Sequence, residues 1–79
     1  MKEGLEKFAI RLKDLRVKKN IKQVEMGKFL GCSMRNYQRI EYGESDIPAT
    51  KLMKLADYFG VTTDYLLGRS EDGGPEREE

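Results

Sequence analysis

Apolar residues recur along this chain at the three- and four-residue spacing of a single helix face. In the first such stretch, from Leu5 to Lys19, the apolar positions are Leu5, Phe8, Ala9, Leu12 and Leu15. Asn20 follows this stretch and tolerates the left-handed backbone conformation that often ends a helix. The pattern therefore predicts a first helix over residues 5–19.

Two short helices separated by a tight turn are predicted next. Gln23 to Leu30 carries an apolar face and is closed by Gly31; the face consists of Met26, Phe29 and Leu30. Ser33 is a favourable N-cap for a third helix from Met34 to Tyr42, which Gly43 ends. Its inward positions are Tyr37 and Ile40. At about 100° per residue, one outward arc holds Met34, Arg35, Gln38, Arg39 and Tyr42.

Gly27 stands inside the second predicted helix, where glycine costs stability relative to alanine. We expect a neighbouring helix to approach closely at this small residue. Cys32, in the turn, is expected to fill space in the core.

The remaining pattern predicts two more helices and a polar tail. Pro48 suits the first turn of a fourth helix that Gly60 ends, with apolar positions at Leu52, Leu55, Ala56 and Phe59. Thr62 caps a last short helix that runs to Leu67. We therefore expect an all-α fold, a compact five-helix domain over residues 1–68. Residues 69–79 contain five acids and two arginines, and we expect an acidic, disordered tail.

Length and composition exclude several classes of protein. Seventy-nine residues suffice for one small domain, and 37% charged residues indicate a soluble chain. No apolar stretch approaches the roughly 20 residues of a membrane helix, and the N-terminal segment, with two acids and a helical pattern, does not resemble a secretory signal. With no His and one Cys, we expect no metal, no cofactor and no enzymatic activity. The single Cys suits a reducing compartment, so we expect a cytoplasmic protein.

The net charge of +1 conceals a gradient along the chain. Residues 1–39 hold 11 Lys or Arg and 4 Asp or Glu, whereas residues 40–79 hold 4 and 10. A basic half of this kind favours a polyanionic partner such as nucleic acid. Segregated solvated helix faces would give the same numbers, so charge alone decides nothing.

Residues 22–43, KQVEMGKFLGCSMRNYQRIEYG, read as helix, three-residue turn and helix. Together with features from Phe8 to Gly68, this segment resembles the phage-repressor-like (Cro/Xre-like) helix-turn-helix DNA-binding domains. The resemblance rests on RLKDLR, Gln23, Gly27, Gly31-x-Ser33, Ile40-Glu41-x-Gly43, Lys54-Leu55-Ala56 and Asp64-Tyr65-Leu66-Leu67-Gly68. It implies a lambda-repressor-like fold that binds double-stranded DNA.

The resemblance also implies which residues contact DNA. The third helix would enter the major groove, with Gln23 against a phosphate at the N-terminus of the second helix. Arg pairs with guanine, Gln with adenine, and Met can touch a thymine methyl group. The expected DNA-binding residues are Lys22, Gln23, Ser33, Met34, Arg35, Gln38 and Arg39. Gln23, Met34, Arg35 and Arg39 could instead be ordinary surface residues.

A pair of charged residues is expected to have a structural role. The resemblance implies an ion pair between Arg16 in the first helix and Glu41 in the third. Because a charge at a helix interface must be matched, and Arg fits a carboxylate with a planar fork, the physical argument agrees. The pair would fix the angle of the third helix.

Three features depart from the family pattern. Lys22 stands where relatives have a Ser or Thr cap, so the second helix is expected to be less firmly capped. The loop Glu44-Ser45-Asp46 is acidic where many relatives carry Lys or Arg; it is either held away from phosphates or reduces affinity. The acidic tail is the third departure.

These features favour a transcriptional regulator, specifically a repressor that binds a palindromic operator as a homodimer. The dimer surface is expected at the fifth helix and the loop before the fourth. The alternative is an antitoxin or adaptor that uses the same fold to hold a protein partner. An enzyme is rejected because no His, metal cluster or phosphate loop accompanies the acids.

Overall fold

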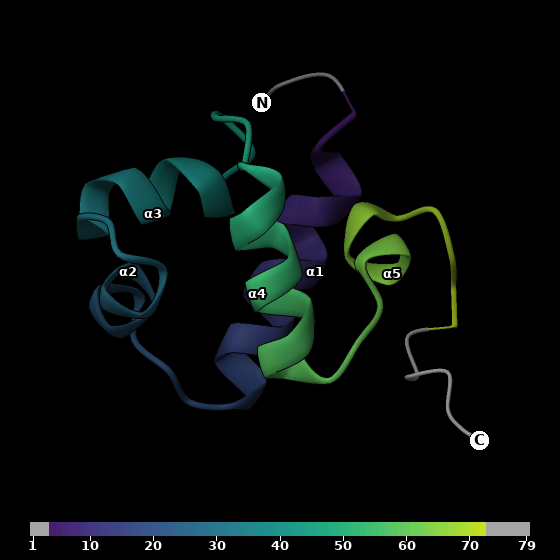
Figure 1. Cartoon of the computed structure of the whole chain (residues 1–79), viewed down its shortest axis with the longest axis horizontal. Coiled ribbons are helices and arrows are strands. Elements are labelled where there is room, and N and C mark those ends of the chain that lie inside the picture. The colour runs from purple at the N-terminus through teal and green to yellow at the C-terminus, as the bar shows by residue number, and fades with distance from the viewer. Residues whose placement is uncertain (1–3, 73–79) are drawn as a thin grey trace.

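Five helices make up the architecture in the computed structural model, which describes residues 4–72. They are α1 (Glu6–Lys18), α2 (Gln23–Leu30), α3 (Met34–Glu41), α4 (Ala49–Phe59) and α5 (Thr63–Leu67). In Figure 1, α4 lies in front of α1, with α2 and α3 to one side and α5 to the other. The described residues contain no strand, which confirms the all-α, five-helix prediction.

The helix ends differ from the predictions by one residue at four places. Leu5 and Lys19 are the N-cap and C-cap of α1, and Tyr42 is the C-cap of α3, although all three were predicted inside the helices. Pro48 is the N-cap of α4 and has extended backbone, rather than standing in its first turn. A cap residue takes part in the first or last hydrogen bonds of a helix, but its own backbone is not helical. Sequence patterns do not distinguish a cap residue from the helical residue next to it.

A single core joins all five helices. Its buried members are Phe8, Leu12, Met26, Leu30, Tyr37, Ile40, Leu55, Ala56 and Leu66. Cys32 is partly buried and packs against this cluster, as expected. Because α1, α2 and α3 all contribute side chains, the core holds α3 at a fixed orientation.

The turn between α2 and α3 explains the glycine inside α2. A Cβ atom at Gly27 would lie 3.0 Å from the carbonyl oxygen of Cys32 and 3.2 Å from the Ser33 carbonyl group. The atoms that approach Gly27 therefore belong to the backbone of the turn and of Ser33, the N-cap of α3, so the neighbouring helix comes close at its very start. The Cys32 N–H also donates to the Gly27 carbonyl at 2.8 Å, which holds the turn against α2.

Contacts with α1 extend past residue 68. Arg11 on α1 donates to the backbone carbonyl of Ser70 at 2.8 Å and to the carboxylate of Glu71 at 2.9 Å. Residues 69–72 of the tail are thus attached to α1, whereas the sequence analysis expected disorder from Arg69 onward. Residues 73–79 lie outside the described residues.

Candidate nucleic-acid interface

The turn leading into α3 sets the direction of that helix. Gly31 adopts a left-handed conformation at φ 74°, which glycine tolerates at no steric cost. Ser33 then begins α3, and its hydroxyl accepts a hydrogen bond from the N–H of Asn36 at 3.0 Å. Since this bond occupies the Ser33 hydroxyl oxygen, Ser33 fixes the start of the helix, a role also expected of it from the sequence.

The outward face of α3 borders an open depression of about 680 Å³. The residues that line it are Arg35, Gln38, Arg39, Tyr42 and Glu44. Met34 stands at the start of the helix with 45% of its surface exposed. The structure thus gathers most of the predicted base-reading residues on one concave surface.

The inward face of α3 ends on a buried carboxylate. Glu41 is only 2% exposed, and Arg16 reaches it with two donors: Nε at 2.6 Å and Nη2 at 3.1 Å. The Tyr37 hydroxyl donates to the same carboxylate at 2.6 Å. A third Arg16 nitrogen donates to the Ile21 carbonyl at 2.7 Å, so this one side chain joins α1, α3 and the loop before α2.

Burial and hydrogen bonding act in opposite directions on Glu41. Burial by itself raises the pKa of a carboxyl group, but donors from Arg16, Tyr37 and Gln23 favour the charged form. The net result is a Glu41 pKa below its ordinary value. The pKa of Tyr37 is raised, first by burial and then by its bond to Glu41. Glu41 is therefore a charged acceptor and Tyr37 a neutral donor at neutral pH.

Gln23 connects the buried carboxylate to the outward face. Its Nε2 donates to Glu41 at 3.0 Å and, more weakly, to the Tyr42 hydroxyl at 3.3 Å. Its Oε1 accepts from Gln38 Nε2 at 2.9 Å. An amide group has two hydrogens, so both Gln23 donors are occupied within the protein. The side-chain contact with phosphate expected for Gln23 would require this network to open.

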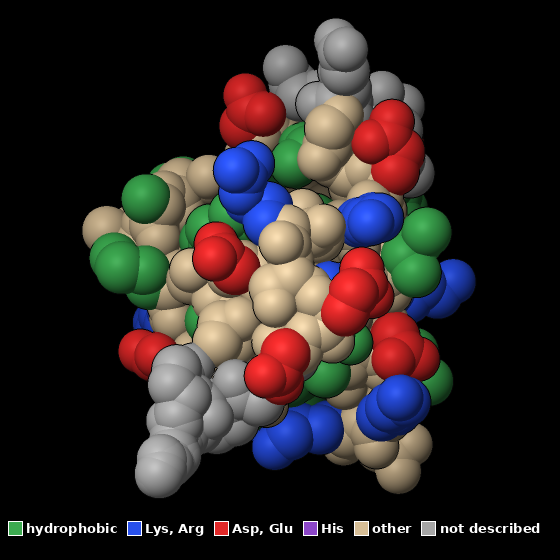
Figure 2. All heavy atoms as spheres, turned by 90° about the vertical axis from the view of Figure 1, so that its right-hand side faces the viewer, with side chains coloured by type: hydrophobic (Ala, Val, Ile, Leu, Met, Phe, Trp, Pro, Cys, Tyr) green, Lys and Arg blue, Asp and Glu red, His purple; other side chains and the backbone are tan. Residues whose placement is uncertain are grey.

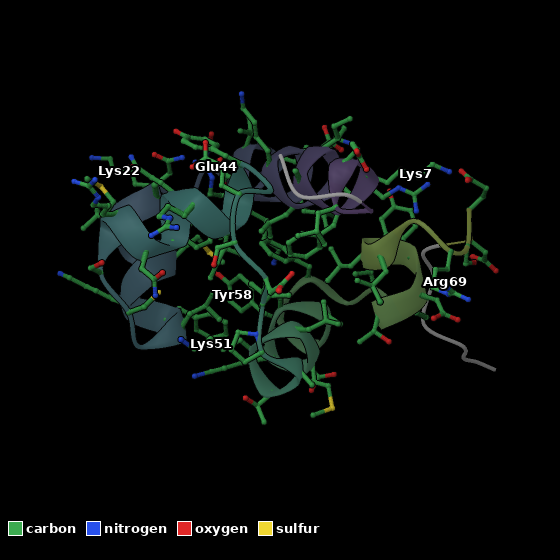
Figure 3. The ribbon with its side chains drawn as sticks, turned by 90° about the horizontal axis from the view of Figure 1, so that it is seen from above. Lys7, Lys22, Glu44, Lys51, Tyr58 and Arg69 are labelled. Atoms are coloured by element: carbon green, nitrogen blue, oxygen red, sulfur yellow. The ribbon has the colours of Figure 1, made fainter. Side chains whose placement is uncertain are left out.

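Lys22 and the acidic loop share one side of the molecule. Figure 3 shows Lys22 and Glu44 at the same edge of α2 and α3, across from Lys51 and Tyr58. Glu44 lines the depression beside Arg39, and its N–H donates to the Arg39 carbonyl at 2.9 Å. Glu44 therefore lies on the same surface as the predicted base-reading residues Arg35 and Arg39.

The start of α2 has a cap that the sequence analysis did not identify. The carboxylate of Glu25 accepts a hydrogen bond from the N–H of Lys22 at 2.8 Å. Glu25 stands three residues after the N-cap residue Lys22, so this bond is the acidic half of a capping box. The missing Ser or Thr at position 22 is thus partly compensated.

Comparison with known proteins places these features in a family. A family model described as helix-turn-helix matches residues 12–66, which include the whole of α2, the turn and α3. The chain belongs to the Xre/Cro-like helix-turn-helix family. This is a family of DNA-binding proteins and not of enzymes, in agreement with the sequence analysis.

Two relatives of this helix-turn-helix protein come from Bacillus subtilis (strain 168). One is the SPbeta prophage-derived HTH-type transcriptional regulator YonR, 38% identical over 60 residues that make up 76% of this chain and 56% of YonR. The other is the HTH-type transcriptional regulator ImmR, 36% identical over 61 residues, or 77% of this chain and 48% of ImmR. The chain thus spans about half the length of the relatives it matches.

Charge is distributed unevenly over the helix-turn-helix domain. Figure 2 views the α5 end, away from α2 and α3, and shows Asp and Glu side chains spread among Lys and Arg. Arg35 and Arg39, by contrast, border the depression on α3 with one acid, Glu44. A polyanion would therefore meet a more favourable potential at this depression than at the α5 end.

Two functional connections were missed from the sequence. Tyr37 was predicted only to face inward, although its position four residues before Glu41 places both on one face of α3. The link between Gln23 and Gln38 joins two helices, and no local pattern indicates it. Tyr37 thus holds the Glu41 carboxylate, and Gln23 holds the Gln38 side chain on the outward face.

Among residues 4–72, no helix is long and apolar enough to cross a membrane. The same residues contain no cluster of three or more His, Cys, Asp or Glu that could hold a metal ion.

Proposed function

We propose that this protein binds double-stranded DNA in a sequence-specific manner and acts as a transcriptional regulator, specifically a repressor. The observation that carries the proposal is the division of α3 into two faces. One face is held by the buried Arg16–Glu41 pair, and the other presents polar side chains around an open depression. A helix anchored on one side and polar on the other suits insertion into a major groove.

The outward residues are assigned by their chemistry. Arg35 and Arg39 carry planar donor groups that pair with guanine, and Met34 offers an apolar contact for a thymine methyl group. Gln38 suits adenine. Lys22 and the N-terminus of α2 contact phosphate, because a helix N-terminus offers unpaired N–H groups to an anion. Ser33 lies beside the backbone of the DNA at the start of α3.

Gln23 has a positioning role in this proposal. Its amide accepts from Gln38 and donates to Glu41, so it holds the Gln38 side chain relative to the buried ion pair. Gln23→Ala would free Gln38, and the preference at the base pair read by Gln38 should relax. Gln38→Ala should have the same effect on that base pair, and the double variant should add little.

We further propose that two copies bind a palindromic operator with half-sites about 34 Å apart. One domain covers few base pairs, and two-fold symmetry doubles the contacts. Similarity to proteins named as transcriptional regulators supports the regulatory role.

Selection of binding sites from random duplex DNA at one stated salt concentration tests the proposal. A palindromic consensus is expected, and log affinity against log salt should fall by about 0.9 per phosphate neutralised. Arg35→Ala should cost about 1–3 kcal/mol on the best site and relax one position. Lys22→Ala serves as the matched phosphate variant and should weaken all sequences alike. Affinity that does not depend on salt would rule out DNA binding.

A further inference from the structure

The outward face of α1 carries two exposed apolar side chains that no other element covers. Ile10 is 67% exposed and Val17 is 52% exposed. With Lys13 and Asp14 they stand at positions i, i+3, i+4 and i+7, opposite the buried Phe8 and Leu12. The four residues surround an open hollow of about 350 Å³. We call this stripe the α1 outer face.

The order of residues on this face is self-complementary. The midpoint of the stripe lies between Lys13 and Asp14, and the apolar residues lie equally far from it on either side. If a second α1 is laid antiparallel across this midpoint, Ile10 meets the partner's Val17 and Lys13 meets the partner's Asp14. A two-fold axis then repeats both contacts, as an interface between identical chains requires.

We propose that the α1 outer face is a contact with a second copy of this chain, packed antiparallel across a two-fold axis. The proposal rests on the proposed function only in that it gives the expected homodimer an interface. Opposite charges face each other in this arrangement, and the exposed apolar side chains cover one another. Asp14 already lies 3.0 Å from Lys18, an exposed pair that can share its carboxylate with the partner's Lys13.

Other surfaces fit a second copy less well. No residue of α5 or of the loop before α4 is among the large apolar side chains exposed on the described part of the chain. On α4, Met53 and Tyr58 are exposed but stand five residues apart, so they point in different directions around the helix. The dimer surface expected at α5 and that loop therefore has less support than α1.

This contact between two copies is expected to be weak because it buries little apolar surface. Two apolar side chains per copy fall short of the roughly 1,000 Å² that a specific, stable interface buries. Association should therefore be reversible, and the dimer fraction should rise steeply with protein concentration. Copies held side by side on DNA would associate more readily, because their effective concentration is higher.

Sedimentation velocity of the full chain without DNA tests the proposal. The mean mass of the unaltered protein should rise from monomer toward dimer as concentration increases to the millimolar range. Val17→Lys should abolish this rise. Met53→Lys is the matched control, since Met53 is also 52% exposed, and it should leave the rise unchanged. A protein that stays monomeric, or two variants that behave alike, would overturn the proposal.

A charge-reversal mixture tests the antiparallel register. Lys13→Asp alone and Asp14→Lys alone each place like charges opposite one another and should associate at least about fivefold more weakly. Mixed in equal amounts, they restore both charge pairs in a heterodimer and should associate again. Lys51→Asp mixed with Asp57→Lys makes the same charge changes on α4 and controls for general attraction. If both mixtures associate equally, the register is wrong.

This test is separate from the DNA-binding proposal. It uses no DNA, so failure of self-association leaves the selected binding sites and their salt dependence intact. Circular dichroism of each variant should match the unaltered protein, because every substituted side chain is at least partly exposed.

Discussion

Arg11 and Arg16 lie five residues apart on α1 and have similar surroundings at first sight. Their side chains are 15% and 13% exposed, and each donates to a backbone carbonyl and to a carboxylate. Their acidic partners differ: the Glu41 side chain is fully buried, whereas that of Glu71 is 80% exposed. The comparison shows that the burial of the acid, more than that of the arginine, separates a structural ion pair from a surface one.

The two acids also differ in their other partners. Glu41 accepts from Tyr37 and Gln23 as well as from Arg16, so each of its oxygens is matched. Glu71 has Lys7 at 3.8 Å as a second, exposed partner. Water can replace the partners of Glu71 but not those of Glu41.

The largest expected effect is at the buried pair. Arg16→Met or Glu41→Leu alone should lower the free energy of unfolding by about 3–5 kcal/mol, because the remaining charge is left buried and unpaired. The double variant should recover much of that loss. A double-mutant cycle from denaturant unfolding measures the coupling; losses below about 0.5 kcal/mol per single variant would show independent surface charges.

Acid should destabilise the protein through Glu41. Its folded-state pKa lies below the ordinary value of 4.5, so the unfolded chain binds the proton more readily. This contribution to stability is present above pH 4.5, falls as the pH drops below it, and is gone once the pH passes the folded-state pKa. Unfolding free energies between pH 7 and pH 3 measure it. In the Glu41→Leu variant, this part of the pH dependence of the unfolding free energy should be absent. The control variant Glu71→Gln should retain it.

At the exposed pair, the arginine should matter more than the acid. Arg11 lies 4.1 Å from the centre of the Tyr65 ring and donates to the Tyr65 and Ser70 carbonyls. Arg11→Met should cost about 1–2 kcal/mol through these contacts. Thermal unfolding measures the loss. A loss as large as that of Arg16→Met would remove the distinction between the two arginines.

The smallest expected effect is that of Glu71→Gln. A carboxylate this exposed contributes little to stability, so the change in unfolding free energy should stay within about 0.5 kcal/mol. The change in unfolding free energy should become smaller still when the salt concentration is raised from about 0.05 to about 1 M, because salt screens surface charges. A larger effect, independent of salt, would place residues 69–72 inside the structural core.

Helix periodicity predicted the fold well because it records the burial of whole faces. Phe8, Leu12, Ile40 and Leu55 were all identified as core positions from spacing alone, and all are buried. Periodicity does not indicate which atoms approach a position when the neighbour is backbone rather than a side chain. Spacing indicates that Gly27 must be small, but only the folded turn shows that the Cys32 carbonyl is what approaches it.

For the candidate site, the sequence indicated which residues face outward but not how they are connected. The arc on α3 follows from 100° per residue, and the structure places Arg35, Gln38 and Arg39 around one depression. The bond between Gln23 and Gln38 depends on the crossing of two helices. Likewise, the contact of Ser70 depends on its lying beside Arg11 of α1, 59 residues away in sequence.

The arrangement of α3 has a consequence for how this protein could acquire a new target. Within the described residues, the side chains of Arg35 and Arg39 have no hydrogen-bond or ion-pair partner, whereas Gln38 is bonded to Gln23. Under the proposed DNA-binding role, substitutions at the two arginines would alter which bases are read while the fold stays intact. A change at Gln38 also removes a hydrogen bond from Gln23, which itself donates to the buried carboxylate of Glu41. Divergence among descendants of this chain should accumulate first at positions 35 and 39, and position 38 should change together with position 23.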